Sequence, residues 1–162
     1  MPIVLNPALP DGAIAVSLNP PPLTLPIYAG KVSAAQSRWA SAAQDYIDDD
    51  SGVLGGRLDL NAKFISNPPS TFLMPMDGYS QVMRGIYPGT YAIIDKSTDV
   101  KNGRLVVVWY GDKYILKEFH RIGNIVKLRS AHPDRKTYRS IIYKDDDVLL
   151  IWGVMRYGIN EY

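Results

Sequence analysis

Beyond residue 70 the chain alternates short apolar runs with turn-forming residues at intervals of roughly 8 to 12 residues. The turn signals are YPG, KNG, GD, RIGN and KDDD. The runs that we interpret as strands are residues 71–74, 90–95, 104–110, 113–119, 125–129, 141–143 and 148–156. Many short strands with tight turns between them are typical of a small antiparallel sheet or barrel. The sequence therefore predicts a mainly β fold.

Residues 1–29 differ from the rest in composition. They hold seven of the 12 prolines, which favour extended backbone over a helix or a central strand. The stretches AIAVSL and LTLPIY nevertheless alternate well enough to lie on another surface as edge strands. Residues 33–47 are rich in alanine, with Ser33 as the candidate cap, and predict one short helix. We expect a flexible proline-rich arm over 1–29 and a β-rich domain over 30–162.

Composition narrows the function classes. A formal net charge of +2 is too small to predict a dedicated nucleic-acid-binding protein. The chain has no cysteine, which removes disulfides, thiol nucleophiles and cysteine-bound zinc and favours a cytoplasmic location. We expect no export signal and no membrane anchor, because the N-terminal region lacks a basic segment and its apolar runs are short. The two histidines, His120 and His132, are isolated in the sequence and predict no metal site.

Ser80 is the candidate nucleophile. It follows Gly78 and precedes a run without strand periodicity, so we expect it on a loop or turn at the end of a strand. A serine that only closes a turn would look the same. The nucleophile reading therefore requires a base.

Lys117 is the candidate base. In the strand KYILKEF the period of two puts it on one face with Ile115 and Phe119, which predicts burial. Burial disfavours the ammonium form and lowers the pKa of a lysine, and a neutral amine can accept a serine proton. The alternative is a lysine whose stem covers the core while its head reaches water. The pattern alone leaves both open.

An ordered series of segments resembles the UmuD branch of the LexA-type self-cleaving proteins. It comprises the dipeptide AG at 29–30, AAQDYIDDD, RLDLNAKFISNPPSTFLMPMDGYS, GTYAIID, NGRLVVVWYGDKYILKEF and DDDVLLIWGVMRYG. The resemblance implies a β-rich domain with a Ser-Lys dyad made of Ser80 and Lys117. It also implies a self-cleavage site at the bond between Ala29 and Gly30, and a serine endopeptidase that removes its own arm.

The same resemblance carries expectations about partners. The trimmed protein would be a homodimer and the accessory subunit of an error-prone translesion polymerase of the UmuC kind, in the SOS response to DNA damage. A RecA filament on single-stranded DNA would activate cleavage. Backbone N–H groups at Gly78 and Tyr79 would support the oxyanion, and neither a metal nor an organic cofactor would be required. We expect no sequence-specific DNA binding.

The chain departs from the family pattern beside the nucleophile. Tyr79 and Gln81 stand where an acid and a methionine are usual. A first alternative is therefore an inactive pseudoprotease that acts as a regulatory binding subunit. A second is a LexA-like repressor fragment, disfavoured because residues 1–29 show no helix-turn-helix pattern. A third is a signal-peptidase relative, disfavoured by the expected lack of a membrane anchor.

Overall fold

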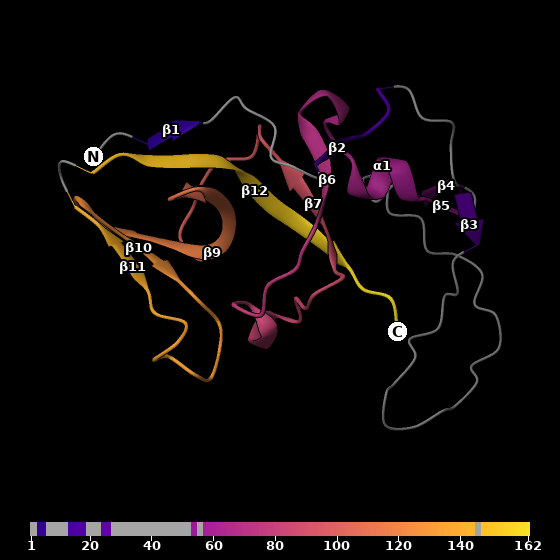
Figure 1. Ribbon diagram of the computed structural model, residues 1–162. Helices are drawn as coiled ribbons and strands as arrows, with labels where there is room; N and C mark the ends of the chain where they lie inside the picture. The colour runs from indigo at the N-terminus through magenta and orange to yellow at the C-terminus, as the bar shows by residue number, and fades with distance from the viewer. Residues whose placement is uncertain (1–2, 6–12, 19–23, 27–52, 55–56, 145–146) are drawn as a thin grey trace. The chain divides into compact units, whose positions relative to one another are not determined.

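The computed structural model describes residues 3–5, 13–18, 24–26, 53–54, 57–144 and 147–162 (Figure 1). The chain forms two compact units, one made of residues 1–16 and 67–162 and the other of residues 17–66. The expected helix at 33–47, the bond between Ala29 and Gly30 and the boundary between arm and domain all lie outside the described residues. Within those residues, no helix is both long and apolar enough to cross a bilayer.

A nine-stranded sheet forms the larger unit. Eight strands follow the order β11-β10-β9-β8-β12-β7-β6-β2 with antiparallel neighbours, and β1 pairs with β12 in parallel. Their bounds are β1 Ile3–Leu5, β2 Ile14–Ala15, β6 Thr71–Pro75, β7 Tyr91–Asp95, β8 Leu105–Tyr110, β9 Lys113–Ile122, β10 Ile125–Arg129, β11 Ile141–Tyr143 and β12 Leu149–Ile159. The predicted mainly β class is confirmed. The seven strands expected beyond residue 70 are all present, and β9 and β12 each run three residues further than predicted.

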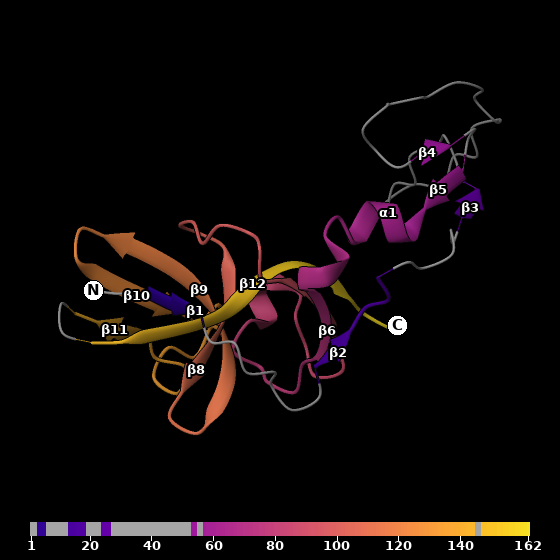
Figure 2. The same cartoon turned by 90° about the horizontal axis from the view of Figure 1, so that it is seen from above.

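The long strand β12 joins the two halves of this sheet. It lies between β7 and β8, which follow one another in the chain but do not pair with each other. Figures 1 and 2 show it running along the unit, and Figure 2 shows β8, β9 and β10 gathered at one end of it. Its register shifts at two points, once against each neighbour. Gly153 lies at the shift facing β8, and a Cβ there would come within 2.7 Å of the Ile94 side chain, so only glycine fits.

Two apolar clusters form the core because successive side chains of each strand point to opposite faces. On β8, for example, Val107 belongs to one cluster while Val106 and Val108 belong to the other. The buried members of the first are Met74, Ile86, Ala92, Ile94, Val107, Leu116, Trp152 and Met155. Those of the second are Val106, Val108, Phe119, Val126, Leu128, Leu149, Ile151 and Val154.

Edge strands from residues 1–29 appear where the alternating stretches predicted them. β2 lies within AIAVSL and pairs with β6. In the smaller unit β3 (Thr24–Pro26) lies within LTLPIY and forms a sheet in the order β3-β5-β4, with β4 at Val53–Leu54 and β5 at Arg57–Asp59. The short helix α1 (Leu60–Phe64), which the sequence analysis missed, follows β5. Asp59 caps it by accepting hydrogen bonds from the backbone N–H groups of its first turn.

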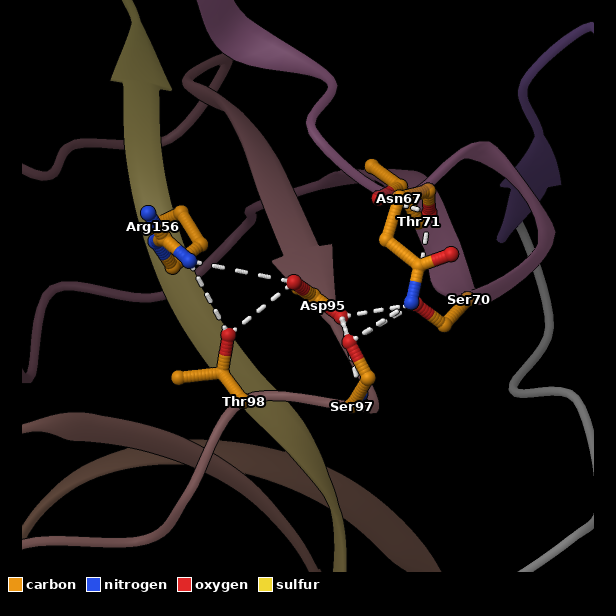
Figure 3. A network of polar contacts seen from close by, with 7 residues as sticks. All are labelled: Asn67, Ser70, Thr71, Asp95, Ser97, Thr98 and Arg156. Atoms are coloured by element: carbon orange, nitrogen blue, oxygen red, sulfur yellow. Dashed lines mark hydrogen bonds and ion pairs between the residues drawn. The ribbon is translucent and has the colours of Figure 1, made fainter.

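A polar network around Asp95 links β7 to β12 and to the turn directly before β6 (Figure 3). The Asp95 carboxylate is buried and accepts hydrogen bonds from Ser70 Oγ, Ser97 N, Ser97 Oγ and Thr98 Oγ1 at 2.7 to 3.0 Å. Arg156 Nη1 on β12 lies 3.8 Å from Asp95 Oδ2. Burial raises the pKa of Asp95, but the hydrogen bonds outweigh it and hold that pKa below its usual value. The network thus favours the charged carboxylate.

Candidate active site

The Ser80 loop follows β6 and precedes the 3₁₀ helix η2 (Val82–Arg84). Ser80 is half-buried and lies in a turn, as the sequence predicted. Its Oγ donates to the carbonyl oxygen of Leu116 on β9 at 3.3 Å. Its own carbonyl accepts a hydrogen bond from the backbone N–H of Ala131 at 2.8 Å. The loop is therefore held both on β9 and on the segment that leaves β10.

Lys117 is buried in the middle of β9, as the strand period predicted. Its exposed fraction is 8%, and it pairs with the fully buried Val106 of β8. Burial lowers the pKa of the Lys117 amine from its usual value. Its Nζ donates to Ser130 Oγ at 2.7 Å. The side chain thus ends on a hydroxyl group of the protein, whereas in the alternative its head group would have contacted only water.

Ser80 and Lys117 line the same cleft, which has a volume of about 870 Å³. The Ser80 hydroxyl contacts the carbonyl of Leu116, the residue directly before Lys117. Gly78 and Tyr79, the expected oxyanion-supporting residues, also line this cleft and are exposed. A hydroxyl and an amine of lowered pKa in one cleft are the components of a Ser-Lys dyad. Proton transfer would require the Ser80 hydroxyl to turn from the Leu116 carbonyl toward Lys117.

Gln81 braces the candidate site in a way that sequence analysis missed. Its side chain is buried, with 1% exposure, and its Nε2 donates to the carbonyls of Leu116 on β9 and Arg129 on β10 at 3.3 and 3.0 Å. Its Oε1 is buried and has no hydrogen-bond partner within the described part of the chain. The departure from the family pattern at position 81 marked this residue as unusual. Its hydrogen-bond partners could not be predicted, because the two carbonyls come from strands distant in sequence. The polar side chain links the nucleophile's loop to both strands.

Glu118 forms a second brace on the opposite face of β9 from Lys117. It contacts Arg84 of η2 and His120, which lies two residues along on the same face. Burial raises the pKa of Glu118, but hydrogen bonds from His120 and Arg84 outweigh it and lower that pKa. The sequence analysis treated His120 as isolated and missed this contact. The contact arises because residues two apart in a strand share a face.

The other histidine has a local role. His132 Nδ1 accepts a hydrogen bond from Asp134 N at 3.0 Å, and its ring stacks on Tyr138 with centroids 3.9 Å apart. Among the residues that the structure covers, no group of three or more His, Cys, Asp or Glu side chains could hold a metal ion.

Comparisons with known proteins identify the family of this chain. Residues 26–156 match the Peptidase S24-like family. The LexA repressor of Clostridium novyi (strain NT) is 30% identical over 92 residues, 57% of this chain and 44% of the relative. The LexA repressor of Clostridium tetani (strain Massachusetts / E88) is 30% identical over 98 residues, 60% of this chain and 48% of the relative. The chain thus matches about half the length of these relatives.

Proposed function

The chain belongs to the Peptidase S24-like family, and from that premise we propose that it is a self-cleaving serine protease with Ser80 as nucleophile and Lys117 as general base. One observation carries the proposal. The Lys117 amine is buried, its pKa is lowered, and it lines the same cleft as the Ser80 hydroxyl. Burial on a strand is costly for a charged lysine, and this cost is explained if the neutral amine is needed as a base.

The proposed reaction cuts the bond between Ala29 and Gly30. Neutral Lys117 takes the Ser80 proton as Oγ attacks the Ala29 carbonyl, and backbone N–H groups near Gly78 and Tyr79 stabilise the oxyanion. Collapse breaks the C–N bond, and the Lys117 ammonium returns the proton to the Gly30 amine. Water, deprotonated by Lys117, then hydrolyses the ester on Ser80 and regenerates the hydroxyl.

The biological role that we propose follows the UmuD branch. The trimmed protein would act as a homodimer and as the accessory subunit of a UmuC-like translesion polymerase in the SOS response. Cleavage would be activated in the cytoplasm by a RecA filament on single-stranded DNA. The support is the ordered series of segments from AG at 29–30 to DDDVLLIWGVMRYG, together with the family membership.

A second candidate is the self-cleaving part of a LexA-type repressor. It is favoured by the relatives, which are LexA repressors. A repressor binds a specific operator, so salt-dependent and sequence-specific DNA binding by the full protein would favour this candidate over the polymerase subunit. Co-purification with a UmuC-like polymerase, without DNA binding, would favour the first.

We predict that the purified protein, incubated at mildly alkaline pH, produces a fragment that begins at Gly30. Ser80→Ala and Lys117→Ala should each abolish that fragment, because one removes the attacking oxygen and the other the base. The double variant should be no worse than either single variant, since the two act as a unit. Intact mass spectrometry measures the fragment, and circular dichroism checks the fold.

Undiminished cleavage in Ser80→Ala would contradict the protease proposal. Absence of cleavage in the parent protein, both alone and with a RecA filament on single-stranded DNA, would favour the inactive pseudoprotease instead.

A further inference from the structure

The hydroxyl of Ser130 is the group that the Lys117 amine contacts. Lys117 Nζ donates to Ser130 Oγ at 2.7 Å, a short and well-formed hydrogen bond. Ser130 directly follows β10, thirteen residues after Lys117, and reaches it because β9 and β10 form a hairpin. We propose that Ser130 is a positioning residue that holds the Lys117 amine in the orientation needed to accept the Ser80 proton. This inference rests on the proposed protease function.

The segment that contains Ser130 also holds the nucleophile's loop. Ala131 N donates to the Ser80 carbonyl at 2.8 Å, and Met83 N donates to the Ala131 carbonyl at 3.0 Å. Two consecutive residues after β10 therefore contact the base through a side chain and the nucleophile's loop through the backbone. This segment therefore contacts both the base and the loop of the nucleophile.

The chemistry requires an acceptor at this place. A neutral amine that donates one N–H to Ser130 has fewer rotational states about its Cε–Nζ bond, and its lone pair stays available to take the proton from Ser80. Once protonated, the buried ammonium needs hydrogen-bond acceptors. Its neighbours on the same strand face, Ile115 and Phe119, are apolar and offer none.

The titratable groups along the cleft are less suited than Ser130 to accept a hydrogen bond from the Lys117 amine. Asp77, Asp112 and Lys113 line it but are exposed, so water screens their charges. Three tyrosines with titratable phenol groups also line the cleft, namely Tyr79, Tyr114 and Tyr138. Glu118, the next residue of β9, points to the opposite face and pairs with Arg84 and His120.

The test measures the rate of fragment formation between pH 6 and pH 10 in the full-length protein. Ser130→Ala should lower the plateau rate about 10- to 100-fold. This ratio corresponds to the free energy that a hydrogen bond to a charged group contributes. It should also move the midpoint of the alkaline rise to lower pH, because the lost acceptor favoured the ammonium form. Ser130→Thr, which keeps a hydroxyl, should restore most of both.

The matched control is Ser140→Ala, the same change at an exposed position before β11, which should leave both plateau and midpoint unchanged. A Ser130→Ala protein with the parent's plateau and midpoint would overturn the inference. So would a lower plateau with an unmoved midpoint, which indicates only a structural role. If the parent itself never cleaves, the proposed function fails, and that result is distinct from either of these.

Discussion

Two buried titratable groups on this sheet, Lys117 and Asp95, have lowered pKa values with opposite meanings. For Asp95 the lower pKa means that the charged form is favoured, because four hydrogen bonds outweigh the effect of burial. For Lys117 it means that the neutral form is favoured, because burial disfavours the ammonium. Asp95 is surrounded by donors, while Lys117 contacts one hydroxyl.

The difference separates a group that holds strands together from a group suited to reaction. A carboxylate saturated with donors has no capacity left for a substrate and contributes to stability as a fixed charge. An amine that is desolvated and poorly partnered lowers stability, but its proton can be exchanged. We therefore infer that the Asp95 network is structural and that the Lys117 site is reactive.

The largest predicted effect tests the reactive side of this comparison. Cleavage should accelerate as pH rises through the lowered pKa of Lys117 and then level off, because only the neutral amine is a base. Lys117→Arg should be inactive at every pH, a loss of at least about 100-fold, because guanidinium does not deprotonate in this range. The measurement is the rate of fragment formation against pH.

The matched control for that profile is the double variant His120→Gln with His132→Gln. It should keep the alkaline rise at the same pH, since neither imidazole serves as the base. A profile that is flat from pH 6 to pH 10, or that collapses in the double histidine variant, would contradict the assignment of Lys117.

The next effect is on stability and has opposite signs at the two sites. Asp95→Asn should lower the free energy of unfolding by about 1 to 3 kcal/mol, because it replaces a carboxylate that accepts four hydrogen bonds with an amide that has one acceptor oxygen. Lys117→Met should raise it by about 1 kcal/mol at neutral pH, because a desolvated amine is removed. Urea unfolding measures both.

The pH dependence of unfolding sharpens the same test. A folded-state pKa below the unfolded value of about 3.9 means that Asp95 stabilises the fold above that pH and loses this contribution as pH falls through the folded pKa. For Lys117 the unfolded state binds the extra proton, so stability rises with pH up to about 10.4. If the stability difference between Asp95→Asn and the parent were the same at acid pH as at neutral pH, the stabilising role of the charged Asp95 would be contradicted.

The smallest predicted effect concerns Gly78 at the mouth of the cleft. A Cβ built there meets no atom within 4 Å, and the backbone does not require glycine. If Gly78 acts through its backbone N–H, Gly78→Ala should cleave within about threefold of the parent, because the donor remains. The fragment assay measures the cleavage rate of Gly78→Ala. The variant for comparison is Gly78→Pro, which lacks the backbone N–H. Severe loss in Gly78→Ala would instead indicate that the cleft needs the space.

Sequence patterns predicted the strands and the burial of Lys117 because both depend on periodicity along one strand. They could not predict the partners of these residues. Ser130 reaches Lys117 only through the register of the β9–β10 hairpin. Gln81 differs from the family pattern in sequence, and only the structure shows that it binds the carbonyls of two strands. Asp95 likewise has partners that are far away in sequence, Ser70 directly before β6 and Arg156 on β12.

The order of strands was equally hidden, since alternation identifies strands but not which strands are neighbours. Nothing in the local pattern shows that β12 lies between β7 and β8. The helix α1 was missed because its five residues are too short for a periodic signal.

The position of β12 has a consequence for protein synthesis. Ser80 lies between β6 and β7 and Lys117 lies on β9, so nucleophile and base come from two halves of the sheet that β12 joins. The pairings of β12 with β7 and β8 connect residues more than 40 positions apart in the chain, and such non-local contacts form slowly during folding. If Ser80 and Lys117 are the proposed dyad, we expect a nascent chain on the ribosome to complete the site only after β12 has been translated and inserted, so that self-cleavage would follow synthesis.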